Sequence, residues 1–168
     1  MDRVDDILAQ WHRERPDLDV APMGLIGRIN RLSHHLGRGM EKTFAAHGLT
    51  AASFDVLATL RRSGRPYSLS PGDLLGTMMI TSGTLTNRID QLEKAGLVER
   101  RQNPEDGRSV LIALTEKGFA VIDATVTAHV ATQARLIEGL SKQDRVALDA
   151  LLSRYLKVFE SGTSEGKS

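Results

Sequence analysis

The sequence predicts a mainly α-helical fold that carries one small β hairpin. Over most of the chain the apolar residues recur at spacings of three and four, the period of an amphipathic helix. Only residues 97–101 and 109–114 are typical of strands, and in the second run apolar side chains alternate at Val110, Ile112 and Leu114. Hydrophobic residues make up 40% of the 168 positions, which is enough for one compact core with appended helices.

Three helices are expected before residue 63. Residues 3–14 place four apolar side chains on one face: Val4, Ile7, Leu8 and Trp11. Residues 23–47 continue with a longer apolar stripe that stops before Gly48, a residue suited to ending a helix. Thr50 then caps a third helix, residues 51–62, and its buried side is formed by Phe54, Leu57 and Leu60.

Two shorter helices follow a break at residues 64–66 and an extended piece at 67–69. Ser70 is expected as the N-cap of the first, with Pro71 at its first position and Asp73 in the capping-box position. Met79 and Ile80 lead into a turn at Thr81, after which the second helix covers residues 82–95 and ends at Gly96.

The rest of the chain is expected to form the hairpin, two more helices and a tail. The hairpin has a long polar tip at residues 102–108. Thr115 caps a helix that carries apolar residues as far as Ile137, and Ser141 with Asp144 begins the last one. The Ser/Gly/Thr-rich segment from Ser161 is expected to be disordered.

Composition excludes several classes of function. The chain has no cysteine, so disulfides, thiolate metal sites and thiol redox sensors are ruled out. No apolar run approaches the ~18 residues of a membrane-spanning helix, and the acidic start is unlike a signal peptide. We therefore expect a cytoplasmic protein. The net charge of +1 neither indicates nor excludes a nucleic-acid partner.

The order of the central elements points to DNA binding. Two short helices joined by a tight turn and followed by a hairpin make a winged helix-turn-helix. In the second helix, Leu85, Ile89 and Leu92 form the core face. The opposite face and the helix start are short and polar, which suits approach to base edges in the major groove. The residues expected to contact DNA there are Ser82, Gly83, Thr84, Thr86, Asn87 and Asp90.

Arginines of the hairpin supply a second expected contact. Arg108, at the tip, is placed to reach a phosphate or a narrow minor groove, and Arg100 and Arg101 are placed to anchor the DNA backbone. The alternative interpretation is an ordinary solvated helix face beside an ordinary hairpin.

These residues resemble the signature of the MarR family of bacterial transcriptional regulators. The resemblance is carried by residues 87–100, by Pro104 to Arg108 and by Leu114 to Gly118, and the flanking helices extend it over residues 23–159. It implies an obligate homodimer with interlocking N- and C-terminal helices that binds a pseudo-palindromic operator, and we expect a repressor. The implied parts are dimerisation helices at 1–48 and 115–160, a DNA-binding lobe at 49–114 and a tail at 161–168.

A dimer also follows from the apolar residues themselves. The terminal helices carry more apolar positions than a monomeric winged module could cover. A two-fold dimer predicts half-sites ~10 bp apart, centre to centre, and an affinity that falls steeply with salt.

Four residues resemble the urate-responsive branch of the same family. They are Trp11 in the extra N-terminal helix, Asp55, Arg62 and Arg88. The resemblance implies that Trp11 and Arg88 contact a purine-like or phenolic anion, and that Asp55 and Arg62 couple its arrival to the recognition helix. Stacking of a planar anion between a ring and a guanidinium is chemically reasonable. The alternative is that Trp11 is a packing anchor and that the charged residues form structural ion pairs or touch phosphates.

Other classes of function find less support in the sequence. No nucleophile with a base, no metal-ligand spacing and no phosphate-binding glycine motif indicates an enzyme or a cofactor. His34 and His35 are adjacent and so diverge by ~100° on a helix, which is poor geometry for one metal. A metal- or pH-responsive regulator based on these or on His12, His47 and His129 stays open. So does a winged-helix scaffold for protein assembly.

Overall fold

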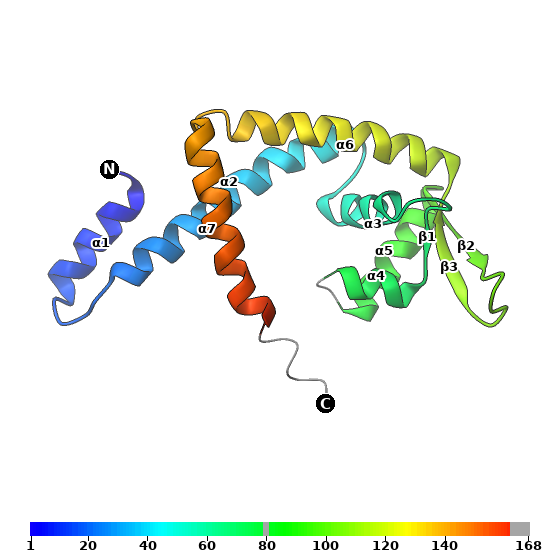
Figure 1. Cartoon of the computed structure of the whole chain (residues 1–168), viewed down its shortest axis with the longest axis horizontal. Helices are drawn as coiled ribbons and strands as arrows, with labels where there is room; N and C mark the ends of the chain where they lie inside the picture. Colours follow the sequence, from blue (N-terminus) through cyan, green and yellow to red (C-terminus); the bar gives the residue numbers. More distant parts are fainter. Residues whose placement is uncertain (79–80, 162–168) are drawn as a thin grey trace. The chain divides into compact units, whose positions relative to one another are not determined.

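The computed structural model describes residues 1–78 and 81–161 (Figure 1). The chain consists of two compact units, Met1–Val130 and Ala131–Ser168. In the first unit, helices precede and follow a small sheet; the second contains the end of α6 and all of α7. The elements in chain order are α1 (Arg3–Glu14), α2 (Ala21–Ala46), α3 (Ala51–Arg62), β1 (Ser68–Leu69), α4 (Pro71–Thr77), α5 (Ser82–Lys94), β2 (Val98–Gln102), β3 (Val110–Leu114), α6 (Glu116–Leu136) and α7 (Lys142–Ser161).

The first helix packs closely on the second. The Asp2 side chain caps α1 in a reciprocal box with Asp5, and both carboxylates accept hydrogen bonds from Arg28 of α2. Gly24 lets the helices approach, because a Cβ there would lie 3.0 Å from Leu8 Cδ1. Charge pairing at one end and a small residue along the contact therefore hold α1 on α2.

The caps expected from the sequence are confirmed. Thr50 accepts from the backbone N–H of Ser53 at the start of α3, and Ser70 and Asp73 form a reciprocal capping box on α4. Gly96 follows α5 with φ +70°, a conformation that favours glycine. At the start of α5 the N-cap is Thr81, where the sequence predicted only a turn. Because such caps involve neighbours in sequence, they locate helix ends without any tertiary contact.

The predicted hairpin is confirmed, and it belongs to a three-stranded antiparallel sheet in the order β1-β3-β2. Val98 pairs with Leu114 at the base of the hairpin, and Gln102 pairs with Val110 near its tip. On the other edge of β3, Ser68 pairs with Ala113. The two-residue β1 is too short to specify a strand locally, so only its pairing with β3 creates it.

The core of the first unit lies where α3, α4, α5 and the sheet meet. Fully buried side chains come from each of these elements and from α6, and burial of one such leucine contributes about 1.5–3 kcal/mol. The central ones are Val56, Leu57, Leu60, Leu74, Leu85, Ile89, Ile112 and Ile122. Phe54, predicted within the buried face of α3, is only partly buried and stacks on Phe44 at 4.4 Å between ring centroids.

A few boundaries differ from the expectations. α2 begins at Ala21 instead of residue 23, and α6 ends at Leu136, one residue before Ile137. α7 continues through Ser161, whose hydroxyl donates to the Lys157 carbonyl at 2.7 Å, so this residue is helical and not part of the tail. Residues 79–80, expected to lead into the turn at Thr81, and the tail at 162–168 lie outside the described residues. No helix in the described part is long and apolar enough to cross a membrane.

Candidate nucleic-acid interface

Helix α5 presents its polar face to solvent from a rigid support. Leu85, Ile89 and Leu92 are buried against the core, while Gly83 and Asn87 on the opposite side are exposed. This is the division of faces that the helical spacing predicts. A helix held by one apolar face, with a short polar face outward, has the geometry of a recognition helix in a major groove.

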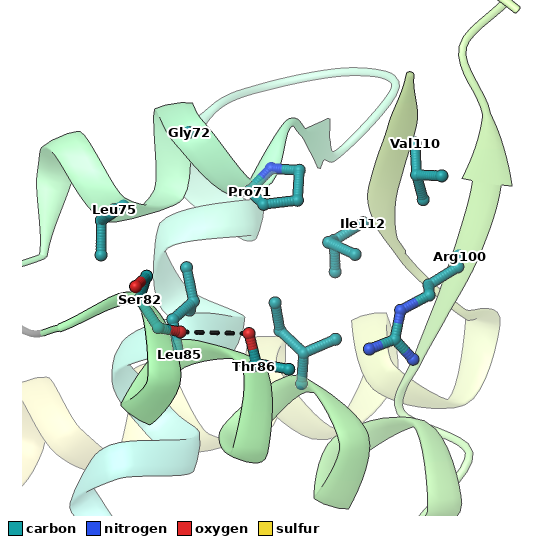
Figure 2. Close-up of a pocket in the computed structure, with 10 residues that line it drawn as sticks. Pro71, Gly72, Leu75, Ser82, Leu85, Thr86, Arg100, Val110 and Ile112 are labelled. Atoms are coloured by element: carbon teal, nitrogen blue, oxygen red, sulfur yellow. Dashed lines mark hydrogen bonds between the residues drawn. The ribbon is translucent and has the colours of Figure 1, made fainter. Parts of the chain in front are cut away.

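Most hydroxyls on α5 are already bonded within the helix. Thr81 and Thr84 share a hydrogen bond of 2.9 Å at the N-cap, and Thr86 Oγ1 donates to the Ser82 carbonyl at 3.1 Å (Figure 2). The Asn87 amide, by contrast, has no hydrogen-bond partner among residues 1–78 and 81–161. It remains available to an external ligand.

An ion-pair cluster joins the hairpin to α5. Arg100 of β2 donates to Asp90 Oδ1 at 2.5 Å and also pairs with Glu93 on the same helix. The hydrogen bond to Asp90 is the main cause that raises the pKa of Arg100. From the sequence we expected Asp90 to face bases and Arg100 to contact the DNA backbone. In this structure the two side chains form an ion pair with each other instead. Only the turn after α5, which sets where β2 starts, brings these charges together.

The wing is the hairpin β2–β3 with its tip. Side-chain bonds order the tip: Asn103 Nδ2 donates to Ser109 Oγ at 3.0 Å, and Gln102 Nε2 donates to the Gly107 carbonyl at 2.8 Å. Arg108 is exposed, and its guanidinium has no partner in the part of the chain that is described. Arg101 pairs with Glu99 of its own strand. Arg108 is therefore the uncommitted cation of the wing arginines that sequence reasoning singled out.

Arg61 forms a link that sequence reasoning missed. It lies on α3 and donates to Asp123 of α6 through Nε and Nη2, at 3.0 and 2.9 Å. Its guanidinium carbon is 4.6 Å from the Phe119 ring centroid and 5.3 Å from that of Tyr67, which directly precedes β1. Such cation–π contacts are worth about 0.5–2 kcal/mol each. Arg61 thus ties α3, the start of β1 and α6 into one support for the interface.

Comparison with known proteins agrees with this geometry. The model of the MarR family matches residues 49–110. The HTH-type transcriptional regulator PecS of Dickeya dadantii is 45% identical over 92% of this chain and 93% of its own length. The chain belongs to the MarR family.

Solved structures of DNA-binding proteins share the fold. A mutant of MarR from E. coli, complexed with operator DNA, superposes with a TM-score of 0.70 at 28% identity, covering 82% of this chain and 95% of that one. A second structure is that of BpsR of Bordetella bronchiseptica, whose DNA binding is regulated by 6-hydroxynicotinic acid. It superposes with a TM-score of 0.67 at 28% identity, covering 77% of this chain and 90% of that one. This regulator is thus a winged-helix DNA-binding protein, and its family assignment confirms the expectation that it is not an enzyme.

The four effector residues expected from the sequence are not joined by any hydrogen bond or ion pair within residues 1–78 and 81–161. Asp55 and Arg62 are exposed on α3, which packs against α5, and Arg88 is half-buried at the edge of the apolar face of α5. Trp11 is 41% exposed on α1, which packs on α2. The structural ion pairs considered as an alternative for Asp55, Arg62 and Arg88 are therefore not present in the described part of this chain.

A cavity of about 460 Å³ opens between α4, α5 and the wing (Figure 2). Its walls are mostly apolar, from Leu75, Leu85 and Ile112, and its polar groups come from Ser82, Thr86 and Arg100. This volume is in the range of small-molecule sites. The one guanidinium on its wall is the Arg100 group already paired with two carboxylates.

The histidines are dispersed over the described residues. His34 and His35 meet edge-to-face at 6.0 Å between centroids, and His47 Nδ1 lies 2.9 Å from the Thr43 carbonyl. His129 packs on the rings of Phe44 and Phe54, with its buried Nδ1 unbonded. No cluster of three or more potential metal ligands occurs among the residues that the structure describes.

Proposed function

We propose that the regulator is a homodimeric repressor that binds an inverted-repeat operator and is released from it by a small planar anion. The observation that carries DNA recognition is the exposed polar face of α5, held on a packed core beside a wing whose Arg108 is unpaired in the described part of the chain. Because its target is chromosomal DNA, we place the protein in the cytoplasm.

Exposed apolar side chains on the terminal helices support the dimer. α7 has no buried residue within its described range, although it carries many large apolar side chains. Those most exposed are Val146, Leu151, Leu156, Val158 and Phe159. On α2, Met23, Leu25 and Ile26 are likewise exposed. An apolar surface of this extent on several helices is typical of an oligomer interface.

The oligomeric state is tested by sedimentation equilibrium on the full chain. Twice the chain mass is expected, and Leu151→Lys with Leu156→Lys should give monomers that bind a full operator weakly. A monomeric wild-type chain at micromolar concentration would contradict the dimer.

Operator binding is tested by gel-shift titration on the intergenic region next to the gene. A dimer with two-fold symmetry needs two half-sites ~10 bp apart, so a duplex with the spacing changed by about half a helical turn is the matched control. Affinity should fall steeply between low and physiological salt. Equal retention of both duplexes would remove the operator proposal, and a reporter gene that loses expression on deletion of the protein would argue against repression.

Two unpaired guanidiniums support an anionic effector near the recognition helix. Arg62 and Arg88 have no carboxylate partner in the described residues, although α3 and α5 pack together. A planar anion would satisfy both with charge-assisted hydrogen bonds. Within this chain α1 packs on α2, so we propose that a Trp11 ring stacks on the anion from the other subunit of the dimer. Urate and phenolic acids have this chemistry, and the relative BpsR is regulated by an aromatic acid.

The cavity beside Arg100 suits a different ligand. The Arg100 guanidinium is already paired with Asp90 and Glu93, and the other walls of the cavity are largely apolar. An anion there would compete with two carboxylates that are already in place. We therefore assign the anionic effector to Arg62 and Arg88 instead of to this cavity.

The effector is tested by release of operator DNA. Urate and a hydroxybenzoate are titrated into the complex of the wild type and of Arg88→Ala, Arg62→Ala and Trp11→Phe. Release is expected with the wild type, weakened about tenfold or more by loss of either arginine, as the loss of one charge-assisted contact predicts. It should be unaffected in the control Arg15→Ala, whose side chain pairs with Asp17. No release at millimolar ligand would eliminate this effector while leaving DNA binding intact.

Two alternatives remain testable with the same material. A protein-assembly scaffold would retain no DNA in the gel shift and would be indifferent to Arg108→Ala. A pH- or metal-responsive regulator would change its operator affinity across the range in which histidine titrates, about pH 5 to 8, or on addition of Zn²⁺, without any organic effector.

A further inference from the structure

The chemistry of the α5 face specifies which bases it can read. This inference rests on the proposed operator binding and concerns its sequence preference. In the major groove, an Asn or Gln amide pairs with adenine N6 and N7, a free Arg or Lys pairs with guanine O6 and N7, and a methyl group contacts the thymine methyl.

Asn87 is the uncommitted amide at the centre of the outward face. It is exposed, lies opposite the buried Leu85 and Leu92, and has no partner within residues 1–78 and 81–161. Gly83, one turn earlier on the same face, has open space where a Cβ would stand, so the helix can lie close to the groove floor. This combination favours bidentate contact with adenine.

The threonines present methyl groups in preference to hydroxyls. Thr86 Oγ1 is bound to the Ser82 carbonyl, and Thr84 Oγ1 is bound to Thr81 at the N-cap. The Thr86 hydroxyl therefore already donates its one proton and can only accept from a base, whereas its Cγ2 methyl is free to contact a thymine methyl. With the Thr86 methyl beside the Asn87 amide, the helix can contact an adenine together with a thymine that is its neighbour or its pairing partner.

No guanidinium lies at the centre of the α5 reading face within the described residues. Arg100 is bound to Asp90 and Glu93, and Arg88 is half-buried at the flank of the core face. Lys94, at the C-terminal end of α5, is two turns beyond Asn87. The centre of the reading face, within the described residues of α5, therefore carries no free cation.

We propose that α5 reads an adenine–thymine pair at the centre of each half-site, with the Asn87 amide on adenine N6 and N7 and the Thr86 methyl against a thymine methyl. Base discrimination by one good bidentate contact corresponds to about 5- to 150-fold in affinity.

The first experiment selects binding sites from a pool of random duplexes with the wild-type dimer. An A·T pair is expected at a symmetric position of both half-sites, and Asn87→Ala should lose preference at that pair alone. A G·C pair at the position that Asn87→Ala relaxes would overturn the proposal, as would unchanged preferences in the variant.

The second experiment removes single groups from the selected site. Replacing the adenine by 7-deazaadenine deletes N7 and should weaken the wild type at least about 5-fold but leave Asn87→Ala unaffected, the range set by one base contact. Replacing the thymine by uracil deletes the methyl and should weaken the wild type but not Thr86→Ser, which keeps the hydroxyl bound to Ser82. Each variant serves as the control for the other analogue, and melting curves establish that both are folded.

The outcomes separate this proposal from the underlying one. If no duplex is enriched and no DNA is retained, operator binding itself fails. If one sequence is enriched but the wild type is indifferent to both base analogues, the protein binds an operator and the adenine–thymine reading is wrong.

Discussion

Arg100 on β2 and Asp90 on α5 meet at 2.5 Å, and this contact fastens the wing to the recognition helix. Glu93 holds the same guanidinium from the next turn of the helix. The orientation of the wing relative to α5 decides whether one module can engage a major groove and the adjacent backbone together. An ion pair between them therefore bears on both stability and DNA binding.

Loss of the Arg100 cluster should weaken the fold modestly. The side chain is about a third exposed, so Arg100→Ala is expected to lower the free energy of unfolding by about 1 kcal/mol, the upper end for surface pairs. Arg101→Ala is the matched control, because its pair with Glu99 lies within one strand and joins no second element. Urea unfolding measures the stability of both variants. An equal loss of unfolding free energy in the two would show that linking β2 to α5 adds no stability.

Arg108 should contribute to DNA affinity without sequence preference. Arg108→Ala is expected to weaken specific and random duplexes alike, because a phosphate or minor-groove contact at the wing tip reads no base edge. The slope of log affinity against log salt should fall by about one. Arg15→Ala, in the loop after α1, is the control; a loss confined to one base position would contradict this role.

Arg61 should stabilise the fold, whereas its neighbour Arg62 should not. Arg61→Ala removes the Asp123 hydrogen bonds and both ring contacts, and is expected to cost about 1–2 kcal/mol in the free energy of unfolding. Arg62→Ala, one residue along, has no partner to lose in the described residues and should change stability by less than about 0.5 kcal/mol. Thermal melts compare the pair; similar shifts would mean that the Arg61 contacts are incidental.

Gly118 should tolerate no side chain. A Cβ there would stand 1.9 Å from the Leu97 carbonyl oxygen, a backbone atom that cannot rotate away. Gly118→Ala is expected to destabilise the protein by about 3 kcal/mol. Gly76→Ala, in α4 with nothing within 4 Å, is expected to stabilise it by about 0.5–1 kcal/mol. Denaturant midpoints measure the contrast, and a destabilised Gly76→Ala would indicate a general intolerance instead of a specific clash.

Acid should loosen α1 from α2. The pKa of Asp2 is lowered, chiefly by its hydrogen bond from Arg28. The contribution of the Asp2–Arg28 pair to folding stability is therefore fully present above pH 3.8, the ordinary pKa of an aspartate. It is lost as the pH falls through the lowered pKa of Asp2 in the folded state. Trp11 on α1 is the only tryptophan, so its fluorescence reports the change as pH is lowered through this range. Arg28→Ala should shift the transition upward in pH; an unchanged midpoint would exclude Arg28 as the cause.

Local patterns determined most of the secondary structure and the outline of the interface. Thr50, Ser70 and Gly96 mark helix ends through contacts with their own neighbours, so they could be read directly from the chain. The spacing of Leu85, Ile89 and Leu92 determined which side of α5 is buried, and hence that Asn87 faces outward. These inferences succeed because capping and helical periodicity act over a few residues.

Tertiary structure decided which charged side chains are free. Arg100 meets Asp90 only because the turn at Gly96 sets where β2 begins, and Arg61 meets Asp123 across 62 positions of sequence. β1 exists only because Ser68 pairs with Ala113. The sequence alone determined the recognition helix and its outward face, whereas long-range packing decided that Arg100 is neutralised while Arg108 and Asn87 remain available. The physical reason is that an ion pair depends on the distance between two atoms, and that distance is set by the core on which both elements pack.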